Sequence, residues 1–214
     1  MTSELGSLVG AVDRAFARRD PALVTWPDPH TGGRESLPEE YSRVTDAAKW
    51  RILGARVDAW VRVLLDRRLA AVHPIDLREI TWAPPLPRLT SAVRVVPVAA
   101  GALPLIVVRN AIDDVPDAGI TLGLGDPAEC VGWFPDCGCD ACDNGSEPHL
   151  DTLDEYLLAI VGGRYRRLTR GDRVIVDLAP TGWRASGECD DGEVKRILAD
   201  PRGWRVLSGA PWVG

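Results

Sequence analysis

Residues 95–103 read Val95-Val96-Pro97-Val98-Ala99-Ala100-Gly101-Ala102-Leu103, with apolar runs on both sides of a short turn. β-Branched residues in these runs favour extended backbone, and the small pair Ala100-Gly101 is typical of a turn. A connection this short joins antiparallel strands, because a parallel crossover needs about a dozen residues or more. The stretch therefore predicts two strands of an antiparallel sheet.

Similar short runs continue along the chain on both sides of this stretch. They are rich in β-branched residues and are separated by proline and glycine clusters. Their short connections predict an antiparallel meander from about residue 75 to residue 134. The strands are expected at residues 77–82, 92–98, 103–109, 120–124 and 128–134.

Helical periodicity dominates the segments outside the meander. Apolar residues recur at three- and four-residue spacing in each of these segments, which is the pattern of a helix with one buried face. Helices are expected at residues 3–18, 45–70, 148–161 and 191–199. A hairpin at 165–169 and 173–178 and a last strand at 204–208 complete the expected elements.

These elements predict a single α+β domain spanning residues 1–214. Residues 1–74 form its mainly helical part, 75–134 its meander, and 135–214 a cysteine-rich turn, a helix, a hairpin and a C-terminal strand. Later strands are expected to extend the meander sheet, and helices 45–70 and 148–161 to cover it.

Composition limits the classes of function. The 214 residues carry a net charge of −6, whereas a nucleic-acid-binding protein has a basic surface, so we expect no nucleic-acid partner. The N-terminus lacks the basic and apolar regions of a signal peptide, and no apolar run is long enough to span a membrane. The sequence therefore predicts a soluble cytoplasmic protein with no membrane partner.

Charge is unevenly distributed along the chain. Between Arg109 and Arg164 there are twelve acidic residues and no lysine or arginine. A basic run follows at Arg164, Arg166, Arg167, Arg170 and Arg173. Surfaces of opposite sign can meet across the fold, or they can bind a protein partner or a second copy in a homodimer.

The cysteine turn, residues 137–143, reads Cys137-Gly138-Cys139-Asp140-Ala141-Cys142-Asp143. Thiols stay reduced in the cytoplasm, where clustered cysteines favour metal or redox roles. Zinc accepts four thiolate or imidazole ligands on short turns. Cys137, Cys139 and Cys142 are therefore candidate zinc ligands. Cys130 is the main candidate for the fourth position, and His149 and Cys189 are alternatives.

Two other interpretations of the cysteine turn stay open. The thiols can fill small apolar gaps while Asp140 and Asp143 bond to nearby backbone groups. Alternatively, the cysteines form a disulfide or a redox pair. A thioredoxin-like role for Cys139 and Cys142 is disfavoured, because neighbouring carboxylates oppose formation of a thiolate.

A family resemblance rests on two sequence blocks. The first is Phe134-Pro135-Asp136 followed by the cysteine turn, and the second is Tyr41-Ser42-Arg43-Val44-Thr45-Asp46. Together they resemble an uncharacterised family of actinobacterial proteins that carries a "CGCDACD" block and an upstream "YSRVT" block. The resemblance implies an actinobacterial origin and a domain of unknown function, and it draws attention to Tyr41 and Arg43.

Two classes of function follow from these observations. The sequence lacks a complete dinucleotide fingerprint, a phosphate-binding loop and a recognisable catalytic triad, which favours a binding or scaffolding module over an enzyme. The alternative is an enzyme whose pocket is formed by Tyr41, Arg43 and the cysteine turn. In either case, we expect Arg43 to neutralise one of Asp136, Asp140 and Asp143.

Overall fold

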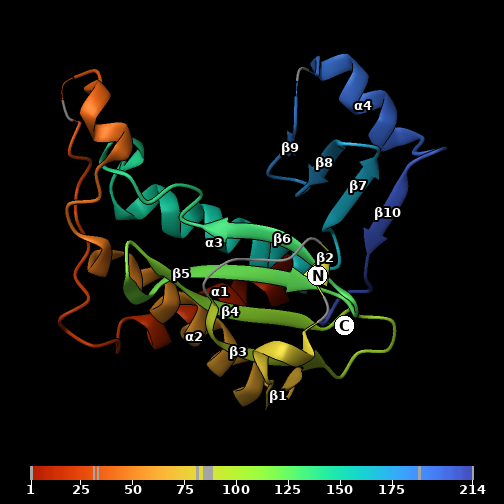
Figure 1. Cartoon of the computed structure of the whole chain (residues 1–214). Helices are drawn as coiled ribbons and strands as arrows, with labels where there is room; N and C mark the ends of the chain where they lie inside the picture. The colour runs from red at the N-terminus through yellow and green to blue at the C-terminus, as the bar shows by residue number, and fades with distance from the viewer. Residues whose placement is uncertain are drawn as a thin grey trace.

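A six-stranded sheet forms the centre of the computed structural model, which describes residues 2–30, 32, 34–80, 82–83, 89–187 and 189–213 (Figure 1). Its strand order is β1-β3-β4-β5-β6-β2, and the meander β3-β4-β5-β6 runs through its middle. All neighbours are antiparallel except β2 and β6. The strands are β1 (Ala70–Pro74), β2 (Trp82–Ala83), β3 (Leu89–Pro97), β4 (Leu105–Ile112), β5 (Val115–Leu124) and β6 (Ala128–Phe134). The predicted α+β class with an antiparallel meander is confirmed.

Strand β4 is buried on both faces of the sheet. Successive side chains of a strand point to opposite faces. Leu105 and Val107 belong to the main apolar core with the helices, whereas Ile106 and Val108 pack with Ile80 and other residues on the other face. This two-sided burial explains why β4 begins with an uninterrupted apolar run.

Three helices cover one face of this sheet (Figure 1). They are α1 (Thr2–Phe16), α2 (Arg51–Asp66) and α3 (Ser146–Val161). Trp50 and Trp60 are among the largest fully buried side chains of the core that these helices share with the sheet. The three helices correspond to the predicted segments at 3–18, 45–70 and 148–161. No helix among the described residues is long and apolar enough to cross a lipid bilayer.

The later strands form a second sheet, so the prediction that they extend the first sheet is wrong. Its order is β10-β7-β8-β9, and it lies beside the main sheet with α4 packed on it (Figure 1). Leu168, Ile175 and Val194 form a separate small core there. The elements are β7 (Arg166–Arg170), β8 (Arg173–Asp177), β9 (Trp183–Ala185), α4 (Asp191–Ala199) and β10 (Arg205–Ser208). Strand β9 was not predicted.

The predicted helix at 45–70 is too long at its C-terminal end. A 3-10 turn at Ala47–Trp50 leads into α2, and Arg68 then adopts a positive φ of 57°. This left-handed conformation ends the helical path. Residues 70–74 instead form β1, where Val72 pairs with Val95 of β3. Pairing with a distant strand therefore outweighs the local helical pattern in what was expected to be a helical segment.

The expected strand at 77–82 is also corrected. Leu77–Glu79 forms a 3-10 turn, because the Asp76 side chain accepts a hydrogen bond from the Arg78 N–H and caps it. Only Trp82–Ala83 is a strand, paired in parallel with β6, and residue 81 lies outside the described residues.

Candidate metal centre

The cysteine turn connects β6 to α3 and contains a short 3-10 turn at Asp140–Cys142. Gly138 lies against the meander, and a Cβ atom added there would be 2.9 Å from Cγ2 of Ile112. A larger residue would therefore push the turn away from β4. The turn is packed onto the fold and does not project freely into solvent.

The side chains of Cys137, Cys139 and Cys142 converge on one point. Their sulfur atoms all lie within 4.8 Å of one another, and those of Cys137 and Cys139 are 3.1 Å apart. Cys139 is buried, whereas Cys137 and Cys142 are exposed. Thiolates bind zinc at about 2.3 Å, so three sulfurs in a group of this size can hold one ion between them.

Cys139 and Cys142 differ in acidity. Burial raises the pKa of Cys139, but hydrogen bonds from Cys137, Cys142 and nearby backbone N–H groups outweigh it, and the net shift is downward. Burial, together with the neighbouring Cys139 and Cys137, raises the pKa of Cys142 to about 12. Cys139 therefore ionises more readily than Cys142, and a bound cation would favour ionisation of Cys142 as well.

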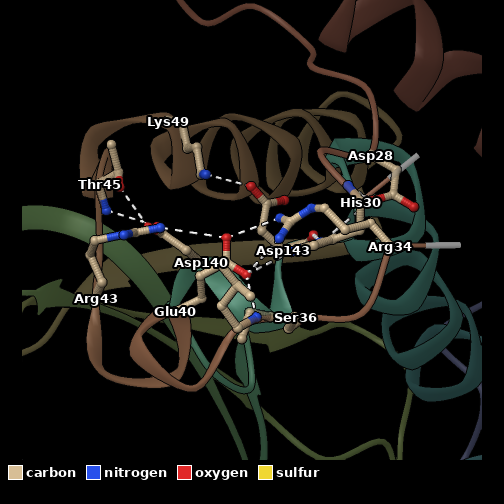
Figure 2. A network of polar contacts seen from close by, with 12 residues as sticks. Asp28, His30, Arg34, Ser36, Glu40, Arg43, Thr45, Lys49, Asp140 and Asp143 are labelled. Atoms are coloured by element: carbon tan, nitrogen blue, oxygen red, sulfur yellow. Dashed lines mark hydrogen bonds and ion pairs between the residues drawn. The ribbon is translucent and has the colours of Figure 1, made fainter. Parts of the chain in front are cut away.

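Asp140 fixes the middle of the turn to residues 43–45 (Figure 2). Its carboxylate accepts hydrogen bonds from Nε of Arg43 at 2.6 Å and from the N–H and hydroxyl of Thr45 at 2.8 and 2.5 Å. The Asp140 N–H also donates to the Arg43 carbonyl at 2.8 Å. Burial raises the pKa of Asp140, but these bonds bring it down to about 2. The predicted neutralisation of a turn aspartate by Arg43 is confirmed, with Asp140 as the partner.

Asp143 fixes the C-terminal end of the turn to a lysine, which Figure 2 shows, and to an indole. Its carboxylate, which is only 4% exposed, accepts hydrogen bonds from Nζ of Lys49 at 2.5 Å and from Nε1 of Trp26 at 2.8 Å. The Gly145 N–H donates to the same carboxylate at 3.0 Å. The ring of His30 bonds to the Asp143 carbonyl at 2.9 Å. Each donor neutralises or satisfies an oxygen that would otherwise be buried without a partner.

Glu40 holds the segment around the second sequence block (Figure 2). Its carboxylate accepts two hydrogen bonds from Arg34, at 3.1 and 2.9 Å, and a third from the Leu37 N–H at 2.7 Å. The Arg34 bonds, and then the Leu37 bond, lower the pKa of Glu40 to about 2. Tyr41 lies beside this network with 63% of its surface exposed.

The model of a protein family described as a family of unknown function, DUF6226, matches residues 12–212 of the chain. The chain belongs to this family. The match includes both sequence blocks, the cysteine turn and most of the second sheet. Neither a curated protein nor a solved structure matches the chain. The domain of unknown function that the resemblance implied is thus confirmed, while the actinobacterial origin and the two blocks as family markers stay predictions.

A pocket of about 310 Å³ lies beside the thiols in this family member. Its walls include Cys137, Cys142, Asp136 and His149. Tyr41 and Arg43 do not line it, so the contact between the two sequence blocks does not form this pocket. The His149 side chain that lines this pocket comes from the first turn of α3. Its ring packs edge-on against Trp50, with 4.6 Å between the ring centroids.

The two remaining cysteines lie outside the group of sulfurs found among the described residues. Cys130 is buried on β6, where burial raises its pKa to about 11, and it is close enough to Tyr156 and Tyr165 to affect their ionisation. Cys189 lies by the second sheet, 3.2 Å from Nη2 of Arg173. The role of Cys130 as a metal ligand stays a prediction that this placement does not favour.

Several residues of the site were not selected from the sequence. Lys49, Trp26 and Glu40 all bond to the cysteine turn or to its neighbours. Lys49 is one of only two lysines in the chain, a signal that could have drawn attention to it. The other two carry no local pattern that separates them from ordinary surface or core residues.

Proposed function

We propose that this protein is a binding module in which a zinc ion, held by Cys137, Cys139 and Cys142, stabilises the cysteine turn. The observation that supports this most is the convergence of the three sulfur atoms within 4.8 Å. Thiolates are soft ligands that select zinc among the common divalent ions of the cell. A cytoplasmic location, which the composition favours, would keep the thiols reduced and available.

A metal has a clear structural role at this position. The cysteine turn contains two aspartates and a glycine and has little apolar surface of its own to bury. Segments of this kind gain stability from metal binding, because the site does not exist in the unfolded chain. The Asp140 and Asp143 contacts hold the turn to the fold, and zinc would fix the positions of the thiols within it.

The surface beside the turn supports a role in binding a protein partner. Leu37 and Tyr41 are 49% and 63% exposed and flank the Glu40 network. Ser36 donates a hydrogen bond to the Ala141 carbonyl at 3.2 Å, which places this apolar surface next to the cysteine turn. The net charge of −6 argues against nucleic acid as the partner.

The alternative, an enzyme with a pocket formed by Tyr41, Arg43 and the cysteine turn, has less support. Arg43 bonds directly to Asp140, so the two blocks meet in a satisfied contact. The thiol-lined pocket has other walls. These observations favour the module over the enzyme.

Elemental analysis of the untagged protein, purified reduced and without chelator, tests the proposal. We expect about one zinc ion per chain. Cys139→Ser should abolish the zinc content, while the matched control Cys189→Ser should retain it, because Cys189 lies by the second sheet. Zinc-free wild-type protein that remains folded and does not take up added zinc would refute the proposal.

A further inference from the structure

A histidine nitrogen beside the thiols is buried and has no hydrogen-bond partner. This atom is Nε2 of His149, for which the structure gives no partner among the described residues. Cys137 and Cys142 line the same pocket as His149. A buried polar atom without a partner costs free energy, on the order of 1–3 kcal/mol, and a bound ion is one of the arrangements that removes this cost.

His149 is in the first turn of α3, shortly after the cysteine turn, and its side chain lines the same pocket as two of the thiols. A neutral imidazole has one ring nitrogen that can bind an ion. Histidines that bind metals usually donate from the second nitrogen to a carbonyl, a carboxylate or water, which fixes the tautomer.

Trp50 provides a second, independent observation. Its side chain is fully buried, and its Nε1 also has no hydrogen-bond partner among the described residues. Nε1 lies 3.8 Å from the position that a Cβ atom on Gly138 would occupy, so this N–H is next to the cysteine turn. The indole also packs edge-on against His149. Two unpartnered nitrogens, one of Trp50 and one of His149, therefore lie beside the cysteine turn.

We infer that Nε2 of His149 is the fourth ligand of the ion, and that the site is a closed one of three thiolates and one imidazole. The inference rests on the proposed zinc site. A neutral imidazole suits the fourth position, because three thiolates already give the bound ion a net charge of −1. A fourth thiolate would add another negative charge to an acidic turn. The unpartnered Trp50 N–H, next to Gly138, would supply a hydrogen-bond donor beside the ion.

Metal binding must bring the imidazole and the thiols closer together. Nε2 of His149 is outside the group of ligand atoms that lie within 4.8 Å of one another. The turn that carries the thiols is held by Asp140 at its middle and by Asp143 at its C-terminal end, whereas His149 borders the 310 Å³ pocket. The pocket gives the imidazole space to approach the thiols, and the first turn of α3 would be stabilised when it does.

Cobalt substitution in the full-length protein tests the inference. Tetrahedral Co²⁺ with thiolate ligands has strong visible absorption, and zinc competition against the cobalt form gives the zinc affinity. We expect His149→Gln, which keeps the approximate size and an N–H donor, to weaken zinc binding by more than about 100-fold, beyond the loss typical of a neighbouring non-ligand residue. We expect His149→Cys to retain tetrahedral cobalt absorption and to show an increased thiolate-to-cobalt band.

The control variant is His73→Ala, since His73 is exposed on β1 and should not affect the metal. Wild-type affinity and an unchanged cobalt spectrum in His149→Gln would overturn the role of His149 while leaving the three-thiolate site intact. Loss of binding in Cys130→Ala together with retention in His149→Gln would assign the position to Cys130 instead. Absence of metal binding in the wild-type protein would overturn both the inference and the proposed function.

Discussion

Nε of Arg43 lies 2.6 Å from Oδ2 of Asp140, although 97 residues separate the two in the sequence. This contact joins the two sequence blocks and, with the Asp143 contacts, holds the cysteine turn on the fold through protein groups alone. The thiols are therefore brought together before any ion binds. A partly preformed site binds metal more tightly, because less conformational entropy is lost on binding.

Removal of the Asp143 carboxylate should destabilise the fold. Asp143→Ala leaves Lys49 and the Trp26 N–H without their acceptor in a mostly buried environment. We expect a loss of about 3 kcal/mol in the free energy of unfolding, as for other buried ion pairs that lose one partner. Chemical denaturation measures the change. Asp136→Ala, directly before the same turn, is the matched control. Because Asp136 is exposed, this substitution should change the free energy of unfolding by no more than about 0.5 kcal/mol. Equal effects of the two variants would contradict the assigned role of Asp143.

Acid should weaken the Asp140 contact within a defined pH range. The pKa of Asp140 is about 2 in the folded protein, below its ordinary value of 3.8. A lowered folded-state pKa gives stability that is fully present above pH 4 and is lost as the pH falls through about 2. The melting temperature of Asp140→Asn should therefore be a few degrees below that of the wild type at pH 6. The difference should shrink below pH 4. A difference that stays constant from pH 6 to pH 2.5 would exclude this linkage.

The regular elements of the main layer were predictable because their periodicity is local. The apolar stripe of α2 and the β-branched runs of the meander strands, separated by proline and glycine clusters, are visible within short windows of sequence. Strand β1 was not, since Val72 is extended only through its pairing with Val95. The later strands were expected to join the main sheet and instead pair with one another, for the same reason. Strand signals indicate that a segment is extended, but they do not identify its neighbour.

The candidate site was predictable in its charge balance but not in its geometry. An acidic turn needs nearby cations, so Arg43 could be assigned to it from the sequence. The choice of Asp140 over Asp136 depends on the position of Thr45, which only the fold sets. The acidic span and the arginine run meet within the chain where Nη1 of Arg167 lies 3.5 Å from Oε2 of Glu129. Because these two charges already neutralise each other within one chain, the contact argues against a homodimer formed by pairing of the two surfaces. The homodimer stays a prediction.

The link between α2 and α3 provides a stability test away from the cysteine turn. Arg56 is buried and donates to both carboxylate oxygens of Asp154, and Nε1 of Trp60 donates to the same group at 2.7 Å. Asp154→Ala should therefore lower the free energy of unfolding by about 3–5 kcal/mol, because the buried guanidinium of Arg56 loses one of its two carboxylate partners. Asp151→Ala, one turn earlier on α3 and exposed, is the control and should change it little. Thermal and denaturant unfolding measure both variants. A stable Asp154→Ala protein would show that Asp13, the other partner of Arg56, is sufficient.

Thiol reactivity should report directly on the metal. In zinc-loaded protein at pH 8, we expect an aromatic disulfide reagent to modify Cys189 readily and Cys137, Cys139 and Cys142 slowly, because coordinated sulfur is a poorer nucleophile than free thiolate. A chelator should make the three turn cysteines reactive together. Cys139 should then react faster than Cys142 where the reagent can reach it, since the pKa of Cys139 is lowered and that of Cys142 is about 12. Cys130 should remain slow in both states, because it is buried and its pKa is about 11.

Two controls make this measurement specific to the turn. Cys189→Ser removes the signal of the distant thiol, so that the remaining change belongs to the turn and to Cys130. Re-addition of zinc after removal of the chelator should restore protection, which separates metal binding from irreversible unfolding of the segment. If the turn packs without metal, neither chelator nor zinc should change the rate at which the reagent modifies any cysteine. Cys137 and Cys142 should then react according to their exposure. That result would support packed thiols over a metal centre.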